Sequence, residues 1–303
     1  MGWWRSSRDG VITARQASAL DRRIVSGLLA DAWWRHGAAA LEDQLAVLHG
    51  GVSAVAFARD RCVGWLGFSV REPAGDPPER WADLASVAIS SGRSPTKALQ
   101  ALFHTVLGGL SARGVTGLVC LTSENWLRES LSDLRFLELD RVIGYARAGR
   151  LSSPPAIAGP ARLRPARASE GELVLALNSA AFAPIWRYDS STLLSWLLTA
   201  DHPILAETGA GPVGFGLTTG SRDREYAQLV RVAIAPQFQG CGIGRQVVVD
   251  AIDYAREIGA GGLCLNTQSS NIISRRLYEG LGFRPTGQAV SVLVRGTSIR
   301  GGV

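Results

Sequence analysis

The sequence has a single lysine, Lys97, so arginine supplies the rest of the 32 positive charges that outweigh 26 negative ones. The arginines are scattered and form no basic arm, so the net charge of +6 does not by itself indicate nucleic-acid binding. No apolar run reaches the roughly 20 residues of a transmembrane helix. We therefore expect neither a nucleic-acid nor a membrane partner.

Cysteine and histidine are also scarce, with four of each in 303 residues. No two cysteines form a Cys-x-x-Cys pair and no histidine lies at metal-ligand spacing from one, so we expect no metal. Isolated cysteines fit a reducing compartment. The opening MGWWRSSRDG lacks the apolar core of a signal peptide, and we expect a cytoplasmic protein.

The chain is long enough for about two domains, and its 46% hydrophobic content indicates a folded protein. Three short motifs recur in the same order at a nearly constant offset, which indicates two copies of one domain. They are VAI at Val87–Ile89 and Val232–Ile234, VGWLGF at Val63–Phe68 with VGFG at Val213–Gly216, and ARQAS at Ala14–Ser18 with ARAS at Ala166–Ser169.

A segment rich in Pro, Gly and Ser, AGRLSSPPAIAGP, separates the copies and is typical of a linker. We expect a first domain at residues 1–150, a linker at 151–160 and a second domain at 161–303. In the second copy, strand patterns alternate with helix patterns, and one helix pattern runs from the glycine-rich segment at 239–244 to Gly259. This predicts an α/β chain (α+β mixed sheet), each domain having a central mixed sheet flanked by helices.

The segment QGCGIG, Gln239–Gly244, stands between the strand pattern LVRVAIAP and this helix pattern. Free amides and the dipole at a helix N-terminus favour an anion, and glycines let the backbone approach it, although a tight turn without a ligand is the alternative. A P-loop would need Lys and then Ser or Thr where Arg245 and Gln246 stand. A dinucleotide loop would need glycine in place of Val247.

The loop resembles the acyl-CoA loop of the GNAT superfamily of N-acyltransferases. The family pattern is Gln or Arg, two residues, Gly, one residue, and Gly or Ala, which Gln239, Gly242 and Gly244 match. NIISRRLYEGLGF, Asn271–Phe283, resembles a second family signature, in which Asn is followed by Tyr seven residues later and then by Gly-Phe. Alone, this segment also fits an amphipathic helix with a stray tyrosine. Both motifs in this order support the family.

The resemblance implies that acetyl-CoA is the co-substrate. Asn271 would bond its pantetheine arm, and Tyr278, beside the thioester sulfur, would protonate the leaving thiolate. Family members splay the strand before the loop from the next strand, so that its backbone near Val232 and Ile234 pairs with pantetheine. The remaining implied cofactor residues are those of the phosphate loop, Gln239, Gly240, Gly242, Gly244 and Arg245.

Family members often place a glutamate as general base at one of two positions, which here hold Gln228 and Asn266. An amide can orient a water but cannot usefully accept a proton at neutral pH. Trp186 and Tyr188 lie between the first two helices of the second copy, where family members contact acceptors, and are candidate substrate residues. Because neither base position holds a carboxylate, we expect an acceptor amine of low pKa, which is a small molecule or an α-amine.

The first copy lacks these motifs. The offset places SPTKAL, residues 94–99, at the loop position, where Pro95 removes an amide and Lys97 replaces Gly242. In NWLRESLSDLRF, Ser132 or Leu131 takes the place of the tyrosine. We expect two tandem GNAT-like domains of which the first is degenerate and non-catalytic, either a scaffold or one wall of the acceptor site. This arrangement is similar to that of mycothiol synthases.

The resemblance implies an N-acetyltransferase that moves an acetyl group from acetyl-CoA to a primary amine by direct attack in a ternary complex. No Ser-His-Asp or Cys-His pattern supports an acyl-enzyme. Two alternatives stay open: a ribosomal-protein-type N-terminal protein acetyltransferase, which the second copy also resembles, and a non-catalytic acyl-CoA sensor. The acceptor partner would be a small-molecule or peptide amine, and the protein a monomer or homodimer.

Overall fold

The computed structural model describes residues 11–38, 40–73, 78–149, 159–220 and 225–296. Most of the expected linker, residues 151–158, lies outside these ranges. The chain divides into two compact units, which are described separately. Unit 1 contains the residues up to Leu139 and those from Val290, and unit 2 contains Asp140–Ala289.

Unit 1 is a mixed sheet with helices packed against it. Its sheet order is β1-β3-β4-β5-β6-β13, in which β13 is Arg284–Gly296 and β2 pairs with β5. Among its described strands, only β5 and β6 are parallel. Its elements are β1 (Ile12–Gln16), α1 (Arg22–Asp31), β2 (Trp34–Gly37), α2 (Leu41–Gly50), β3 (Val52–Ala58), β4 (Arg61–Val70), β5 (Trp81–Ile89), α3 (Pro95–Ala112), β6 (Gly117–Thr122) and α4 (Asn125–Asp133).

Unit 2 repeats this order of elements, except that it has no counterpart of β2 among its described residues. Its sheet order is β8-β9-β10-β11-β12-β7, with only β11 and β12 parallel. Its elements are β7 (Leu137–Ala148), β8 (Arg162–Pro165), α5 (Gly171–Ala181), α6 (Ser190–Thr199), β9 (His202–Thr208), β10 (Gly211–Thr219), β11 (Ala227–Ile234), α7 (Ile243–Glu257), β12 (Gly262–Gln268) and α8 (Ile272–Gly280). Strands β7 and β13 each have residues in both units. The expected duplication and mixed sheet are confirmed.

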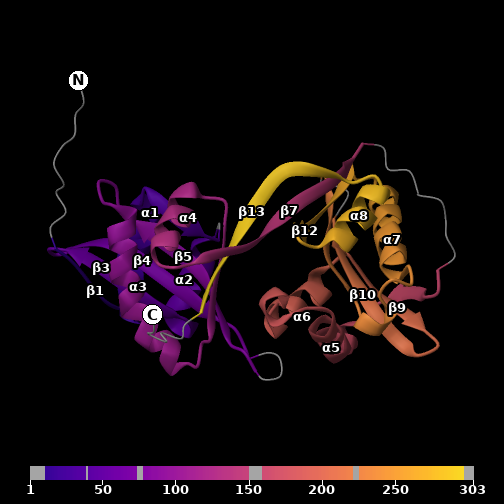
Figure 1. Ribbon diagram of the computed structural model, residues 1–303, viewed down its shortest axis with the longest axis horizontal. Helices are drawn as coiled ribbons and strands as arrows, with labels where there is room; N and C mark the ends of the chain where they lie inside the picture. Colours follow the sequence, from indigo (N-terminus) through magenta and orange to yellow (C-terminus); the bar gives the residue numbers. More distant parts are fainter. Residues whose placement is uncertain (1–10, 39, 74–77, 150–158, 221–224, 297–303) are drawn as a thin grey trace. The chain divides into compact units, whose positions relative to one another are not determined.

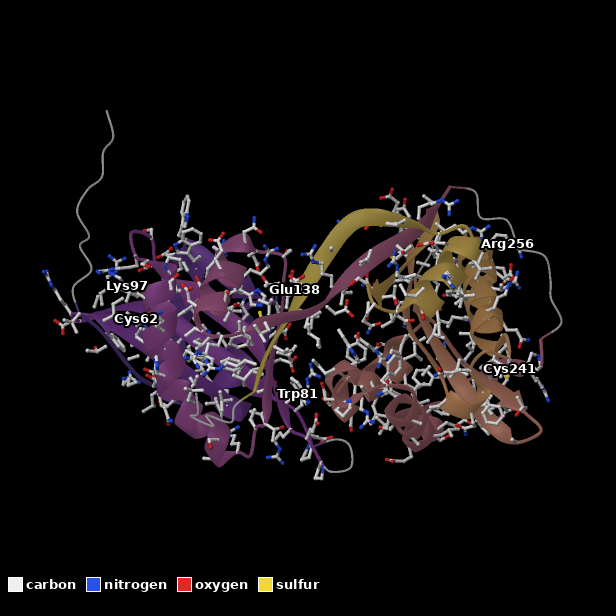
Figure 2. All side chains as sticks on the ribbon, viewed as in Figure 1. Cys62, Trp81, Lys97, Glu138, Cys241 and Arg256 are labelled. Atoms are coloured by element: carbon white, nitrogen blue, oxygen red, sulfur yellow. The ribbon has the colours of Figure 1, made fainter. Side chains whose placement is uncertain are left out.

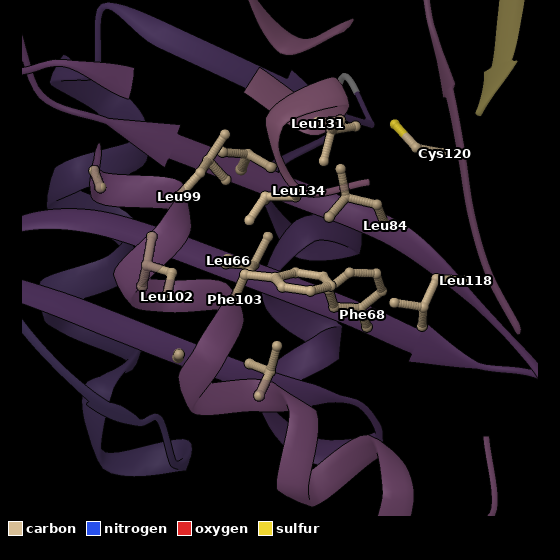
Figure 3. Packing of buried hydrophobic residues seen from close by; sticks show 14 of the residues in the cluster. Leu66, Phe68, Leu84, Leu99, Leu102, Phe103, Leu118, Cys120, Leu131 and Leu134 are labelled. Atoms are coloured by element: carbon tan, nitrogen blue, oxygen red, sulfur yellow. The ribbon is translucent and has the colours of Figure 1, made fainter. Parts of the chain in front are cut away.

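Unit 1 has two buried clusters, one between the sheet and helices α1 and α2 and a larger one between the sheet and helices α3 and α4. Phe103 of α3 packs edge-on against Phe68 of β4 and Phe136, with ring centroids 6.3 and 5.8 Å apart. Leu131 of α4 and Cys120 of β6 close the same cluster (Figure 3). Full burial of such side chains is the main stabilising term for a domain of this size.

In unit 2, helices α7 and α8 cover one face of the sheet and helices α5 and α6 the other (Figure 1). The buried residues of α7 recur at helical spacing, from Val247 to Ala255, as the apolar pattern predicts. Gly259 ends the helix with φ of +74°, so the expected glycine cap is confirmed. Figure 2 marks Cys241 and Arg256, which lie just before α7 and in its last turn.

The two units do not follow the boundaries expected from the repeat. β7, encoded by the first copy, pairs with β12 along Gly262–Gln268, and β13, encoded by the second, pairs with β6 along Gly117–Thr122. A repeat shows which residues were duplicated, whereas backbone pairing decides where each strand lies. We call this arrangement the strand exchange. No helix in the described ranges has the length and apolar character needed to cross a membrane.

Candidate active site

Strands β11 and β12 are paired only where they begin. Pairing joins Ala227–Leu229 to Leu263–Leu265, and no further pair joins the two strands within the described residues, although β11 continues to Ile234. On its other edge, β11 stays paired with β10 as far as Ile234. The expected divergence of these strands is therefore present.

Backbone alternation decides which groups face the unpaired edge of β11. The amide of Ala235 donates to the carbonyl of Val213 on β10 at 2.8 Å. In an antiparallel ladder, alternate residues turn their N–H and C=O groups to opposite edges. The backbone groups of Ile234 and Val232 consequently point away from β10, towards the edge that β12 leaves free.

A cavity of about 500 Å³ lies at this divergence. Its walls come from β11, the glycine loop, α7, α8 and the segment after α5. The structure brings together the following predicted site residues along its lining: Val232, Ile234, Gln239, Gly240, Gly242, Gly244, Arg245, Asn271, Tyr278 and Trp186. Gln228, Asn266 and Tyr188 do not line it, and all three are exposed.

The glycines of the loop serve two different needs. Gly240 and Gly242 have φ of +76° and +86°, conformations that L side chains rarely adopt. Gly244 has an ordinary helical conformation, and a Cβ there would meet only Ile234 and Leu277, at 3.8 and 3.9 Å. The fold itself thus tolerates a side chain at position 244. Glycine at this position leaves space in the cavity that a side chain would fill.

The N-terminus of α7 is built to receive an anion. Its N-cap is Gly242, which has no side chain to cap the helix. The amide of Gln246 donates to Gly242 at 3.1 Å, so the amides of Ile243, Gly244 and Arg245 have no helical acceptor. Arg245 lines the same cavity and forms no ion pair with any described residue. Amides, helix dipole and guanidinium all favour a pyrophosphate here.

Two predicted side chains have partners within the protein. The Gln239 amide donates to the carbonyl of Ile234 at 2.9 Å, which fixes the loop on the end of β11. Asn271 caps α8, because its Oδ1 accepts a bond from the Ser274 amide at 3.0 Å. The NH₂ group of Asn271 is therefore still available as a donor. The Gln239 side chain, in contrast, already occupies the Ile234 carbonyl, one of the backbone groups on the open edge of β11.

Tyr278 lies in the wall of the cavity with 8% of its surface exposed. Its ring contacts Tyr145 and Phe283, with centroids 6.3 and 6.0 Å apart. Burial raises the pKa of the Tyr278 hydroxyl, and a hydrogen bond with the Ser274 side chain offsets part of that effect. The hydroxyl therefore keeps its proton at neutral pH, as a general acid requires.

At the other end of the cavity, Arg231 holds the segment that follows α5. Its guanidinium donates to Asn178 Oδ1 and to the Trp186 carbonyl, each at 2.8 Å, and lies 3.5 Å from the Phe182 ring centroid. Burial lowers the pKa of Arg231 to about 10, so it stays charged at neutral pH without a carboxylate among these partners. Phe182 and Trp186, which line the cavity, are thereby tied to β11.

The elements around this cavity match a known family. The Acetyltransferase (GNAT) family matches residues 172–283, which include most of the cavity lining. The chain is also 30% identical over 123 residues to the L-methionine sulfoximine/L-methionine sulfone acetyltransferase of Salmonella typhimurium, covering 37% of this chain and 72% of that protein. The chain belongs to the GNAT acetyltransferase family.

The chain is also similar to the mycothiol acetyltransferase of Pseudarthrobacter chlorophenolicus. The two are 30% identical over 122 residues, and the match covers 36% of this chain and 38% of that protein. The chain spans about two fifths of the length of several curated relatives, the mycothiol enzyme among them. A solved tandem GNAT protein from the clavulanic acid biosynthesis pathway shares the fold across 96% of this chain and 100% of its own, with a TM-score of 0.59 and 12% identity.

The GNAT motifs did not point to every residue of the site. Phe182 and Ser270 line the cavity, and Ser274 bonds Tyr278. Only Ser274 had a sequence signal, because it stands one helical turn before Tyr278. Within the described ranges, no three His, Cys, Asp or Glu side chains are grouped to hold a metal ion.

Proposed function

We propose that the chain is an N-acetyltransferase that transfers the acetyl group of acetyl-CoA to a primary amine by direct attack in a ternary complex. The observation that carries the proposal is that one cavity joins three features: the free amides of α7, the open edge of β11 and the buried hydroxyl of Tyr278. These features suit, in turn, a pyrophosphate, an extended amide-containing arm and a leaving thiolate.

When bound, acetyl-CoA supplies the activated acetyl thioester. The amides of Ile243 to Arg245 would hold its pyrophosphate, while Val232 and Ile234 offer backbone groups to the arm. Phe182 and Trp186 would exclude water from the acceptor end. Tyr278 would donate its proton to the thiolate, so that the leaving group departs as a neutral thiol.

The acceptor end lacks a general base of the usual kind, since none of the described cavity-lining residues is Asp or Glu. An α-amine has a pKa of about 7.7–8.0, so roughly a third is neutral at pH 7.5, against about one part in a thousand of a lysine side chain. We therefore propose a small-molecule or α-amine acceptor. In support, a relative is named for L-methionine sulfoximine and another for streptothricin.

The test is release of free thiol from acetyl-CoA with a panel of amines, followed by mass analysis of the products. The panel holds amino acids, amino sugars, peptides with free N-termini and peptides whose only amine is an internal lysine. We expect turnover with a small molecule or α-amine and a mass gain of one acetyl group. Turnover confined to protein N-termini would favour the ribosomal-protein type, and binding without turnover would favour a sensor.

A further inference from the structure

The turn between β12 and α8 forms part of the cavity wall, because Ser270 and Asn271 both line it. Two backbone bonds are internal to this turn, from Asn271 to Gln268 at 3.1 Å and from Ile272 to Ser270 at 2.9 Å. Helix α8 adds two further contacts, because the Arg275 guanidinium donates to the Ser269 carbonyl at 2.9 Å and Asn271 caps the helix. The Ser269 amide and the hydroxyls of Ser269 and Ser270 have no partner in the turn or in α8.

These three groups and the Ser270 amide bond to β7, the strand that the first copy encodes. The amide of Ser269 donates to the Arg141 carbonyl at 2.7 Å. The hydroxyls of Ser269 and Ser270 both donate to the carboxylate of Asp140, and the Ser270 amide donates to it at 3.3 Å. One carboxylate on β7 thus accepts three hydrogen bonds from two adjacent residues of the turn.

A carboxylate is well suited to this task, because its two oxygens offer about four acceptor sites and no donor. Asp140 is half-buried, and although burial raises its pKa, the bonds from Ser269 and Ser270 outweigh that effect and lower it. Asp140 is therefore ionised at neutral pH. Bonds to an ionised acceptor are stronger than neutral ones.

We propose that Asp140 is a positioning residue of the cavity, which holds the turn Ser269–Asn271 in the conformation that receives the pantetheine arm. The proposal rests on the proposed function, in which Asn271 donates to that arm. Ordering one residue of a turn only on binding weakens affinity by roughly tenfold. The first copy is then more than a scaffold, because its last strand builds part of the cofactor site.

The experiment measures the Kd of acetyl-CoA by calorimetry on the full chain. Asp140→Ala should raise Kd roughly tenfold, with kcat at saturating acetyl-CoA within about twofold of wild type, because Asp140 makes no contact with Tyr278. Asp140→Asn keeps an oxygen for the Ser270 amide and should raise Kd less than about threefold.

Glu138→Ala is the matched control. Glu138 lies on the same strand (Figure 2) and accepts a bond from the Ser291 hydroxyl at 2.8 Å, but this pair belongs to unit 1. Its loss should leave the Kd of acetyl-CoA unchanged. Ser269→Ala tests the same contact from the other side, and it should raise Kd by a few fold and add little to Asp140→Ala in the double variant.

A wild-type Kd in folded Asp140→Ala, or an equal rise in Glu138→Ala, would overturn the proposal while leaving the proposed function intact. Should Asp140→Ala not fold, an unchanged Kd in Ser269→Ala and Asp140→Asn together would overturn it as well. A wild-type chain that binds no acetyl-CoA would overturn the proposed function and this inference with it.

Discussion

In unit 1, the strand that corresponds to β11 is β5, and its outer edge is covered. β5 pairs with β6 only over Trp81–Asp83, just as β11 pairs with β12 only at its start. Beyond that point, β2 pairs with Ser86–Ile89 and sets Trp34 opposite Ile89. In unit 1, strand β2 therefore covers the edge of β5. The corresponding edge of β11 in unit 2 is unpaired and faces a cavity.

The helix that follows this edge is capped in opposite ways in the two units. In unit 1, the Ser94 side chain caps α3, and Pro95 occupies the first turn, where it brings no amide proton. In unit 2, Gly242 caps α7 without a side chain. Unit 1 thus caps its helix with one of its own side chains, whereas the first amides of α7 in unit 2 have no side-chain cap.

The tyrosine position differs while the turn around it is kept. The amide of Phe283 donates to the Tyr278 carbonyl at 3.0 Å, and that of Phe136 donates to the Leu131 carbonyl at 3.0 Å. Leu131, and not Ser132, therefore stands in the place of the tyrosine. At each of these positions, the group in unit 1 bonds or packs within the fold, whereas its counterpart in unit 2 lies at the cavity.

The largest expected effect breaks the loop of unit 2. Gly242→Glu should abolish acetyl-CoA binding, because the side chain strains a left-handed residue and brings a negative charge to the phosphate position. Calorimetry of the wild type should give one site per chain. Gly92→Glu is the matched control, since Gly92 has φ of +72° and equally open surroundings in unit 1, and its binding should match wild type. Two equivalent sites in the wild type would contradict the comparison.

The next effect concerns the hydroxyl of Tyr278, which Leu131 lacks at the corresponding position of unit 1. Tyr278→Phe should lower kcat by roughly 10²–10⁴ while the Kd of acetyl-CoA changes little. Burial raises the pKa of Tyr278 above its ordinary value of 10.0. An acid acts while protonated, so in wild type this residue should cause no loss of kcat until the pH exceeds 10. An unchanged rate in the variant would reduce Tyr278 to a packing residue.

A proline in β2 tests whether this strand alone would prevent acetyl-CoA from binding to unit 1. His36 lies opposite Val87 of β5. The Ser90 amide donates to the carbonyl of Val63 on β4, so by alternation the backbone groups of Val87 point the other way, to β2. His36→Pro should lower the free energy of unfolding by roughly 2–4 kcal/mol in denaturant titrations.

Arg35→Pro is the control for this variant, and it should cost less because alternation turns the Arg35 amide away from β5. Neither variant should gain a second acetyl-CoA site, since the α3 terminus of unit 1 would still carry Pro95. A stoichiometry near two in His36→Pro would show that β2 is the sole block.

The smallest expected effect concerns Glu225, which stands three residues before Gln228, a position where family members often place a glutamate as general base. Glu225 precedes β11, is exposed and does not line the cavity. Glu225→Gln should therefore lower kcat/KM less than about tenfold. Across a series of amines, the pH profile of kcat/KM should follow the pKa of each acceptor. Efficient acetylation of internal lysines, or a collapse of activity in the variant, would refute an acceptor of low pKa.

The cofactor end of the site could be predicted because its parts are local in sequence. The loop from Gln239 to Gly244 and the helix from Asn271 to Tyr278 each carry their geometry in a single turn or helix. Their convergence follows from the parallel pairing of β11 and β12, which the crossover helix predicts.

The acceptor end could not be predicted because it depends on a bulge. Leu217 faces Arg231 and Thr218 faces Leu229, so Val230 is an extra residue on β11. In a regular strand, the side chains of Val232 and Gln228 would lie on the same face of the sheet, because they are four residues apart. The bulge between them places Gln228 on the opposite face. Asn266 faces Gly144 on β7, a pairing that no repeat pattern reveals.

The strand exchange makes the two copies of this protein hard to separate. A fragment starting at Ala161 would carry the phosphate loop and Tyr278, yet the edge of β12 along Gly262–Gln268 would have lost its partner strand. The same cut would leave β6 without β13. Truncation of the gene would expose an unpaired sheet edge, which invites aggregation. Deletion of the first copy would therefore remove a strand from the sheet of unit 2, whereas substitutions within β5 or α3 would leave both exchanged strands in place.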